Sequence, residues 1–221
     1  MAACVACSRF VLERERSRLG LGAQSHWVVY NGVDPAGFPC RWEQPELARE
    51  ARRKLGLADE PTVLFVGKVR QSKGVGVLLA AMGQVWPRHP DAVLILAGGT
   101  EYGRGRVNRA TPFYRHLQEL LQQASGRVIQ TGFIKPADIA AIYQAGNIFV
   151  GPSQVEEGLG MVFLEASASG LPIIATRRGG IPEIVRPDLN ALLVQRHDDP
   201  RELGEANLEV MVYGPRQESQ G

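Results

Sequence analysis

The sequence predicts an α/β protein with a doubly wound parallel sheet, and three observations support this prediction. Short apolar runs rich in Val, Ile and Phe, mostly unbroken by polar residues, are typical of strands buried on both faces. Longer stretches of helical character separate these runs, and such alternation favours parallel strands joined by crossover helices. The 25 Gly and 14 Pro are spread along the chain, which indicates many tight turns between regular elements.

Each element follows from its own residues. We expect strands at residues 27–30, 62–66, 92–97, 127–131, 148–151, 172–175 and 191–194, and helices at residues 46–55, 74–85, 112–124, 136–144, 161–169 and 200–208. Pro136 and Asp138 suit a first helical turn, because Pro needs no donor there and the acid meets the helix dipole. Residues 99–111 are expected to form an exposed insertion loop, and residues 213–221 a polar tail.

The composition excludes several classes of protein. Apolar residues make up 44% and charged residues 22%, which are ordinary globular values and exclude disordered and fibrous chains. The 25 basic and 23 acidic residues leave a formal net charge of +2, so neither nucleic acid nor a membrane surface is an expected partner. No apolar run approaches the roughly 18–20 residues that span a bilayer, and the first residues show no signal-peptide pattern.

Three cysteines cannot form a disulfide framework. Cys4 and Cys7 have the spacing of a redox or zinc site, but no second cysteine pair accompanies them and His26 is the only nearby histidine. We therefore favour small residues packed in a buried strand. A reduced, cytoplasmic protein is the expectation that follows.

A basic loop follows the expected strand at residues 62–66. It begins with Gly67, continues with Lys68, Arg70 and Lys73, and leads into a helix. Ligands of open parallel sheets collect at the carboxyl ends of the strands, where loops lead into helix N-termini, so this loop has the parts of an anion site. It contains neither a Walker loop nor a dinucleotide fingerprint. Its residues fit a phosphate site, and they fit a solvated basic loop as well.

An acidic loop at residues 152–160 precedes the expected helix at residues 161–169. Gly158 and Gly160 let the backbone approach a ligand, and the free N–H groups of the helix start can bind a diphosphate. Glu165 lies eight residues after Glu157, and a carboxylate beside an anion site can accept two adjacent hydroxyls, as on a ribose. The alternative is that both glutamates only complement the helix dipole.

Four motifs in order make the sequence resemble the retaining glycosyltransferases of family four. They are Asn31-Gly32-Val33-Asp34 near a domain junction, the basic loop from Gly67 to Gly74, Thr131-Gly132-Phe133, and Glu157-Gly-Leu-Gly-Met-Val-Phe-Leu-Glu165 followed by Gly179-Gly180-Ile181-Pro182-Glu183. Residues 89–92 and 99–111 are also similar to spore-coat-associated members of that family.

The resemblance implies the Rossmann-like, C-terminal donor-binding half of a GT-B glycosyltransferase. Lys68 and Lys73 would then hold the donor diphosphate, Glu165 the nucleotide ribose, and Glu157 the transferred sugar. The catalytic roles are implied for Glu157, Lys73 and Lys68, which also bind the donor. Phe133 and Ile134 would contact the edge of the base, and the N–H groups of Gly160, Met161 and Val162 would share the binding of the diphosphate. The remaining implied donor-binding residues are Gly67, Gly158 and Leu159.

The resemblance implies no cofactor and no metal, because these cations and the helix dipole neutralise the leaving diphosphate and no Asp-x-Asp motif is found. The family usually has Arg at the position of Lys68, and Lys keeps the charge but loses the bidentate fork. The implied partners are a nucleotide sugar, an unidentified glycan, lipid or small-molecule acceptor, and a partner chain that could supply the acceptor domain.

The domain organisation that we expect has three parts. Residues 1–30 are a remnant of an inter-domain segment with the first strand, residues 31–208 the donor-binding domain, and residues 209–221 a polar tail, with the N-terminal acceptor domain absent. The expected function is sugar transfer with retention, which this chain alone does not perform.

The alternative is a non-catalytic nucleotide-sugar-binding, coat or scaffold module, in which a partner chain covers an exposed apolar face. An unrelated dehydrogenase or phosphatase would need a dinucleotide fingerprint or an activated nucleophile, and we find neither.

Overall fold

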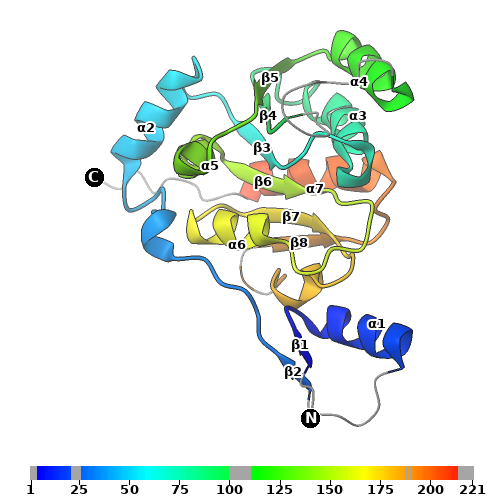
Figure 1. Cartoon of the computed structure of the whole chain (residues 1–221). Helices are drawn as coiled ribbons and strands as arrows, with labels where there is room; N and C mark the ends of the chain where they lie inside the picture. Colours follow the sequence, from blue (N-terminus) through cyan, green and yellow to red (C-terminus); the bar gives the residue numbers. More distant parts are fainter. Residues whose placement is uncertain (1–3, 21–25, 100–110, 188, 190, 214–221) are drawn as a thin grey trace.

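The computed structural model describes residues 4–20, 26–99, 111–187, 189 and 191–213. Its centre is a six-stranded sheet in the order β5-β4-β3-β6-β7-β8 (Figure 1), and every adjacent pair is parallel. The strands are β3 (Thr62–Val66), β4 (Val93–Ala97), β5 (Arg127–Gly132), β6 (Ile148–Gly151), β7 (Ile173–Thr176) and β8 (Ala191–Val194). The predicted doubly wound parallel sheet is confirmed.

The strand order reverses direction once. The chain moves outward from β3 to β4 and β5, returns to place β6 on the other side of β3, and then continues to β7 and β8. The chain after β3 therefore leads to a helix on one face of the sheet, and the chain after β6 leads to a helix on the other face. This switch point is where ligands of doubly wound sheets bind.

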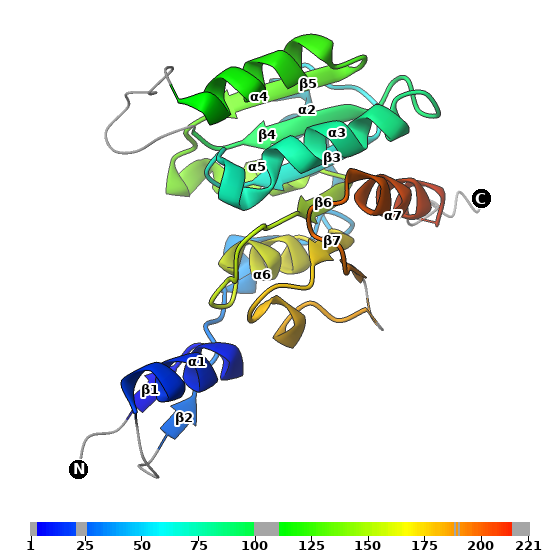
Figure 2. The ribbon, with the colours of Figure 1, turned by 90° about the vertical axis from the view of Figure 1, so that its right-hand side faces the viewer.

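Helices cover both faces of the sheet (Figure 2). The cluster on one face includes side chains from α3 (Val75–Val85), α4 (Pro112–Gln123) and α7 (Pro200–Tyr213). The cluster on the other face includes side chains from α2 (Pro45–Lys54), α5 (Ile139–Ala145) and α6 (Met161–Ala168). Short 3-10 turns complete this domain: η1 (Pro35–Gly37), η2 (Gln71–Lys73), η3 (Pro136–Asp138) and η4 (Ile181–Glu183).

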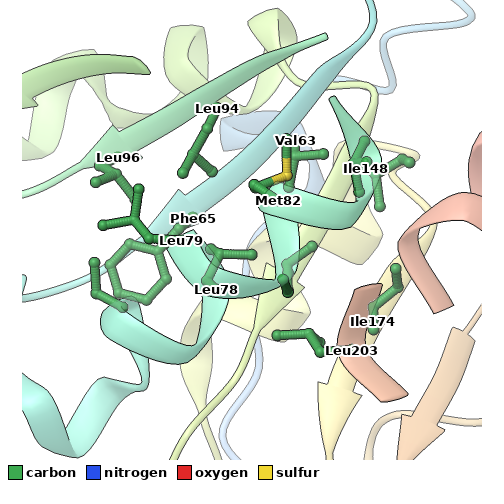
Figure 3. Packing of buried hydrophobic residues seen from close by; sticks show 14 of the residues in the cluster. Val63, Phe65, Leu78, Leu79, Met82, Leu94, Leu96, Ile148, Ile174 and Leu203 are labelled. Atoms are coloured by element: carbon green, nitrogen blue, oxygen red, sulfur yellow. The ribbon is translucent and has the colours of Figure 1, made fainter. Parts of the chain in front are cut away.

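Strand β3 shows why the sequence reads as unbroken apolar runs. Val63 and Phe65 pack into the cluster with α3 and α7, where Leu78 and Met82 meet them (Figure 3). Leu64 and Val66 point to the opposite face and join the other cluster. Because successive side chains alternate between two covered faces, a central strand is apolar at nearly every position, and the buried Thr62 hydroxyl donates to the carbonyl oxygen of Ala145 at 2.9 Å.

A separate unit precedes the large sheet. Strands β1 (Cys4–Ala6) and β2 (His26–Val28) form a two-stranded parallel sheet, joined through helix α1 (Arg9–Leu19), and this unit lies at the lower end of the molecule in Figure 1. The sequence analysis missed β1 and α1 as regular elements and placed the second strand at residues 27–30, slightly late. No residue of α1 is buried, so it lacks the apolar periodicity by which helices are predicted.

The cysteine expectation needs a correction as well. Cys4 lies in strand β1 and Cys7 follows it, but both are half-buried rather than packed in a buried strand. Cys4, Cys7 and Cys40 are all free thiols.

Helix α7 continues to Tyr213, past the expected end at residue 208. Residues 209–213, which the sequence analysis assigned to the polar tail, are therefore helical. Val210 and Met211 explain the extension, because both pack against the core. Of the expected exposed loop only Gly99 and Thr111, and of the expected tail at residues 209–221 only residues 209–213, belong to the residues described. Within the described segments, no helix combines the length and the apolar character needed to cross a membrane.

Arg52 of α2 holds the N-terminal edge of the sheet together. Its guanidinium donates to the carbonyl oxygens of Ala58 (2.8 Å), Glu60 (2.7 Å) and Ala145 (3.1 Å) and to the side chain of Asn147 (3.1 Å). One buried side chain thus satisfies acceptors from two segments, residues 58–60 close by in sequence and residues 145–147 more than 90 positions away.

We predict that Arg52→Leu lowers the free energy of unfolding by about 3 kcal/mol, because several buried carbonyl oxygens lose their donor. Urea denaturation measures this change. Arg53→Ala is the matched control, since the neighbouring Arg53 makes only an exposed ion pair with Glu50 and its loss leaves the midpoint nearly unchanged. Equal effects of the two substitutions would contradict the assignment.

Candidate functional site

The basic loop (residues 67–74) and the acidic loop (residues 152–160) lie in direct contact at the switch point between β3 and β6. The N–H of Gln154 donates to the carbonyl oxygen of Ser72 at 2.9 Å. Gly74 has φ +73°, and a Cβ there would lie 1.8 Å from the carbonyl oxygen of Pro152. Only glycine permits this backbone conformation together with this approach, so Gly74 lets the two loops meet.

Lys73 and Glu157 carry that contact into the side chains. The Lys73 ammonium, at the end of η2, forms an ion pair with Oε1 of Glu157, and the Ser153 hydroxyl donates to the same oxygen at 2.6 Å. The side chains of Lys73 and Glu157 are 29% and 17% exposed, respectively, so the ion pair is partly shielded from solvent. Two residues predicted separately as site residues are thus direct partners.

The N-terminus of α6 lies directly after the acidic loop. Gly160 caps this helix with φ 92°, no side chain accepts hydrogen bonds from its first turn, and the first turn contains no acidic residue. A Cβ at Gly160 would lie 2.6 Å from the ring of Phe163, which explains the glycine. Backbone N–H groups without a side-chain cap, at the positive end of a helix, form a site for an anion.

Glu165 is oriented by a tyrosine that the sequence analysis did not identify. The hydroxyl of Tyr143 in α5 donates to Oε2 of Glu165 at 2.7 Å. Burial and the adjacent Glu165 charge raise the pKa of Tyr143, so the phenol keeps its proton and remains a donor. Among the residues described, none donates to Oε1 of Glu165. The partner of Glu165 is a side chain of another helix, so this carboxylate does more than complement a helix dipole.

Three glycines lie at the carboxyl ends of neighbouring strands. Gly67 follows β3, Gly98 follows β4, and Gly132 ends β5. A Cβ at Gly98 would lie 1.9 Å from the carbonyl oxygen of Gly67, and Gly98 forms a bridge with Gly132. Gly98 was not predicted, although its position directly after an apolar run was the available signal. The three glycines keep this edge of the sheet free of side chains.

The other predicted residues lie around this edge. Phe133 is 80% exposed, and Lys68 is also exposed. Ile134 packs partly against the core, and Leu159 is buried in the acidic loop. Phe133 and Ile134 follow β5, which is separated from β3 by β4, so they lie to one side of the Lys73–Glu157 pair.

Gly179 and Gly180 support the acidic loop from behind. The N–H of Gly180 donates to the carbonyl oxygen of Glu157 at 2.8 Å. A Cβ at Gly179 would lie 2.2 Å from that oxygen, and one at Gly180 would lie 2.3 Å from the carbonyl oxygen of Gly158. The glycine pair was quoted in a motif, but its packing role could not be deduced from spacing.

The site therefore combines a cation, an open helix N-terminus and two carboxylates beside a glycine-lined edge. This arrangement can bind a negatively charged group next to a polyhydroxylated one. Among the described residues, no three His, Cys, Asp or Glu side chains gather closely enough to hold a metal ion.

Comparison with known proteins shows the family to which most of the chain belongs. The sequence pattern of the family described as "Glycosyl transferases group 1" matches residues 60–212. Spore coat protein SA of Bacillus subtilis (strain 168) is 31% identical over 100% of this chain and 58% of its own length. The D-inositol 3-phosphate glycosyltransferase of Corynebacterium kroppenstedtii is 36% identical over 77% of this chain and 37% of its own length.

Solved structures share the fold. The structure of Anabaena Alr3699/HepE in complex with UDP and glucose has a TM-score of 0.76 and 25% identity, over 94% of this chain and 52% of that one. Sucrose-phosphate synthase from Thermosynechococcus elongatus has a TM-score of 0.76 and 29% identity, over 95% and 49%. These neighbours support the Rossmann-like half of the GT-B fold. The chain spans about half the length of the relatives and structures that it matches.

We predict that Gly74→Ala destabilises the chain by about 2 kcal/mol, through a strained left-handed residue and a forced separation of the two loops. Thermal and urea denaturation measure the loss. The control is Gly83→Ala in α3, where a Cβ meets nothing within 4 Å. This control should stabilise the helix by about 0.5–1 kcal/mol. A neutral Gly74→Ala would contradict the close approach described above.

Proposed function

Because the chain belongs to the group 1 glycosyl transferases, which match residues 60–212, we propose that its six-stranded domain binds the nucleotide-sugar donor of a sugar-transfer reaction. The observation that carries this proposal is the meeting of Lys73, Glu157 and the uncapped start of α6 at the switch point of the sheet. A cation and open backbone N–H groups match a diphosphate, and the carboxylates match the hydroxyl groups on either side of it.

Different residues bind different parts of the proposed donor. Lys73, Lys68 and the N–H groups at the start of α6 bind the diphosphate. Glu165, held at Oε2 by Tyr143, accepts the ribose hydroxyls with its remaining lone pairs. Glu157 faces the transferred sugar. The base lies along the glycine-lined ends of β3 to β5, with Phe133 and Ile134 at its edge. UDP in the neighbouring Anabaena structure supports a nucleotide ligand of this size.

The chemistry required of these residues is the stabilisation of a leaving group. When the bond between the sugar and the diphosphate breaks, the electron pair stays on the diphosphate oxygen, and negative charge grows there. In this proposal Lys68, Lys73 and the α6 dipole neutralise that charge, and no metal or cofactor is required. Transfer with retention of the anomeric configuration is the course that we propose, in keeping with the family resemblance.

The location of the acceptor site is a further proposal. The chain matches about half of its relatives' length, so we propose that the acceptor, a glycan, lipid or small molecule, binds outside the residues present here. We accordingly expect the purified 221-residue chain to bind donor without measurable sugar transfer. Robust turnover by this chain would contradict that expectation. Free thiols at Cys4, Cys7 and Cys40 fit the reducing cytoplasm that we propose as its location.

A non-catalytic module that works with a partner chain is the second candidate. Val5 (63% exposed), Trp27 (52%) and Val29 (59%) lie on or beside the two-stranded sheet and support it. Their exposed side chains form apolar surface that a partner chain could cover. Both candidate functions predict donor binding. Only a measurement of sugar transfer in the presence of a partner chain distinguishes them.

We predict that the chain binds one of UDP, GDP and ADP selectively, and that Lys73→Ala and Glu165→Ala each weaken binding by about 1–3 kcal/mol. Titration calorimetry gives the affinities, and the ligand-dependent rise in melting temperature gives an independent measure.

Lys54→Ala is the matched control for this test. Lys54 is a surface residue of α2 that pairs only with Glu50, so its loss should leave nucleotide affinity unchanged. If Lys73→Ala and Glu165→Ala both bind nucleotide as tightly as the unmodified chain, the site assignment is wrong.

A further inference from the structure

One carboxylate outside the predicted site connects the N-terminal unit to the large domain. Oε2 of Glu183, in η4, accepts hydrogen bonds from the N–H of Arg9 (2.8 Å) and the hydroxyl of Tyr30 (2.8 Å). Oε1 accepts from the N–H of Phe10 at 2.9 Å. Glu183 thus binds the first turn of α1 and the segment after β2 at once. Helix α1 has no acidic residue in its own first turn, so Glu183 supplies that charge from a distant part of the chain.

Ser8 extends the connection to the acidic loop. Its hydroxyl caps α1 by accepting from the N–H of Val11 at 3.1 Å, and it donates to the carbonyl oxygen of Gly158 at 2.5 Å. Ser8 is fully buried, and its Cβ lies against Gly180. A serine that only capped a helix would not need a second, buried acceptor in another loop.

The backbone of Glu157 and Gly158 is therefore held from two sides. Gly180 donates to the carbonyl oxygen of Glu157, and Ser8 donates to that of Gly158. On the other side of this backbone, the Glu157 side chain meets Lys73. A shift of α1 away from Glu183 would withdraw Ser8 and leave the carbonyl oxygen of Gly158 without its donor.

We propose that Glu183 and Ser8 are positioning residues of the donor site, which fix the Glu157–Gly158 backbone through the start of α1. This proposal rests on the proposed function, because the consequence of the positioning is nucleotide affinity. It makes the docking of the β1–α1–β2 unit a condition for a fully formed donor site, so donor binding and the docking of this unit strengthen each other.

The charge state of Glu183 fits this role. Burial by itself raises its pKa, but the N–H groups of Phe10 and Arg9 and the Tyr30 hydroxyl outweigh burial and lower the pKa below the usual Glu value. Glu183 is consequently ionised at neutral pH. An ionised carboxylate accepts from all three donors together, which a neutral amide cannot do.

The test uses the 221-residue chain with Glu183→Gln, Ser8→Ala and the double variant. UDP is the probe, with GDP and ADP as alternatives if the unmodified chain prefers one of them. We expect each single variant to weaken nucleotide binding about fivefold, the equivalent of one hydrogen bond. The double variant should weaken it by less than the product of the two effects, because both act through the same carbonyl oxygen.

Amide hydrogen exchange separates positioning from simple stability. In Glu183→Gln we expect faster exchange at Arg9 and Phe10 and also at residues 157–160, without a general increase across the sheet. Glu60→Gln is the matched control. Its carboxylate also accepts a backbone N–H, that of Ala58 at 2.6 Å, but it precedes β3 at the opposite edge of the sheet. If Glu183→Gln fails to fold, Tyr30→Phe removes one of the three donors to Glu183 at a residue that is 43% exposed, and it should act in the same direction.

A failure of the positioning proposal and a failure of the proposed function give different experimental results. Unchanged nucleotide affinity in Glu183→Gln, or unchanged exchange at residues 157–160, would overturn the positioning role while Lys73→Ala still reports on the donor site. Fully multiplicative effects of the two substitutions would overturn the shared route. If the unmodified chain binds none of the three nucleotides, the proposed function fails, and the positioning proposal fails with it.

Discussion

The close approach of two backbones, Gly74 to the carbonyl oxygen of Pro152, is the constraint on which the site depends. It brings the ends of β3 and β6 together where the strand order reverses, and it allows Lys73 to reach Glu157. Neither charge could be partly buried there alone, because each would lose hydration without compensation. The parallel sheet supplies the frame, and Gly67, Gly98 and Gly132 place no side chain at the ends of β3, β4 and β5.

The features that sequence predicts well here are those with a local cause. Central strands are almost entirely apolar because both faces are covered, so β3, β4 and β6 were placed within a residue of their observed bounds. Helix α1 has no such signal, since none of its residues is buried and its first turn is stabilised by Glu183, more than 170 positions away. The end of α7 was misplaced because Val210 and Met211 are helical through packing rather than through a local pattern.

The candidate site shows the same difference between features with a local cause and features set by tertiary contacts. Lys73, Glu157 and Glu165 could be identified from motifs, since each motif is contiguous. Their partners could not be, because Tyr143 reads as one more apolar helix residue. The pairing of Lys73 with Glu157 joins motifs 84 positions apart, which spacing alone does not reveal. Motifs therefore indicate candidate site residues, whereas the groups that orient those residues are set by tertiary contacts.

The Lys73–Glu157 pair has a consequence for the proposed donor complex. A diphosphate carries more negative charge than one carboxylate, so it competes for the Lys73 ammonium when it binds at the start of α6. Glu157 then loses its cation, and a partly buried carboxylate without any partner would oppose binding. In the complex that we propose, Glu157 would keep one partner after Lys73 turns to the phosphate, because the Ser153 hydroxyl already donates to its Oε1. The Glu157 backbone is also held by the N–H of Gly180, so we expect the carboxylate to keep its orientation. The ion pair orders both side chains in the free chain, and we expect Ser153 to lower the cost of separating them.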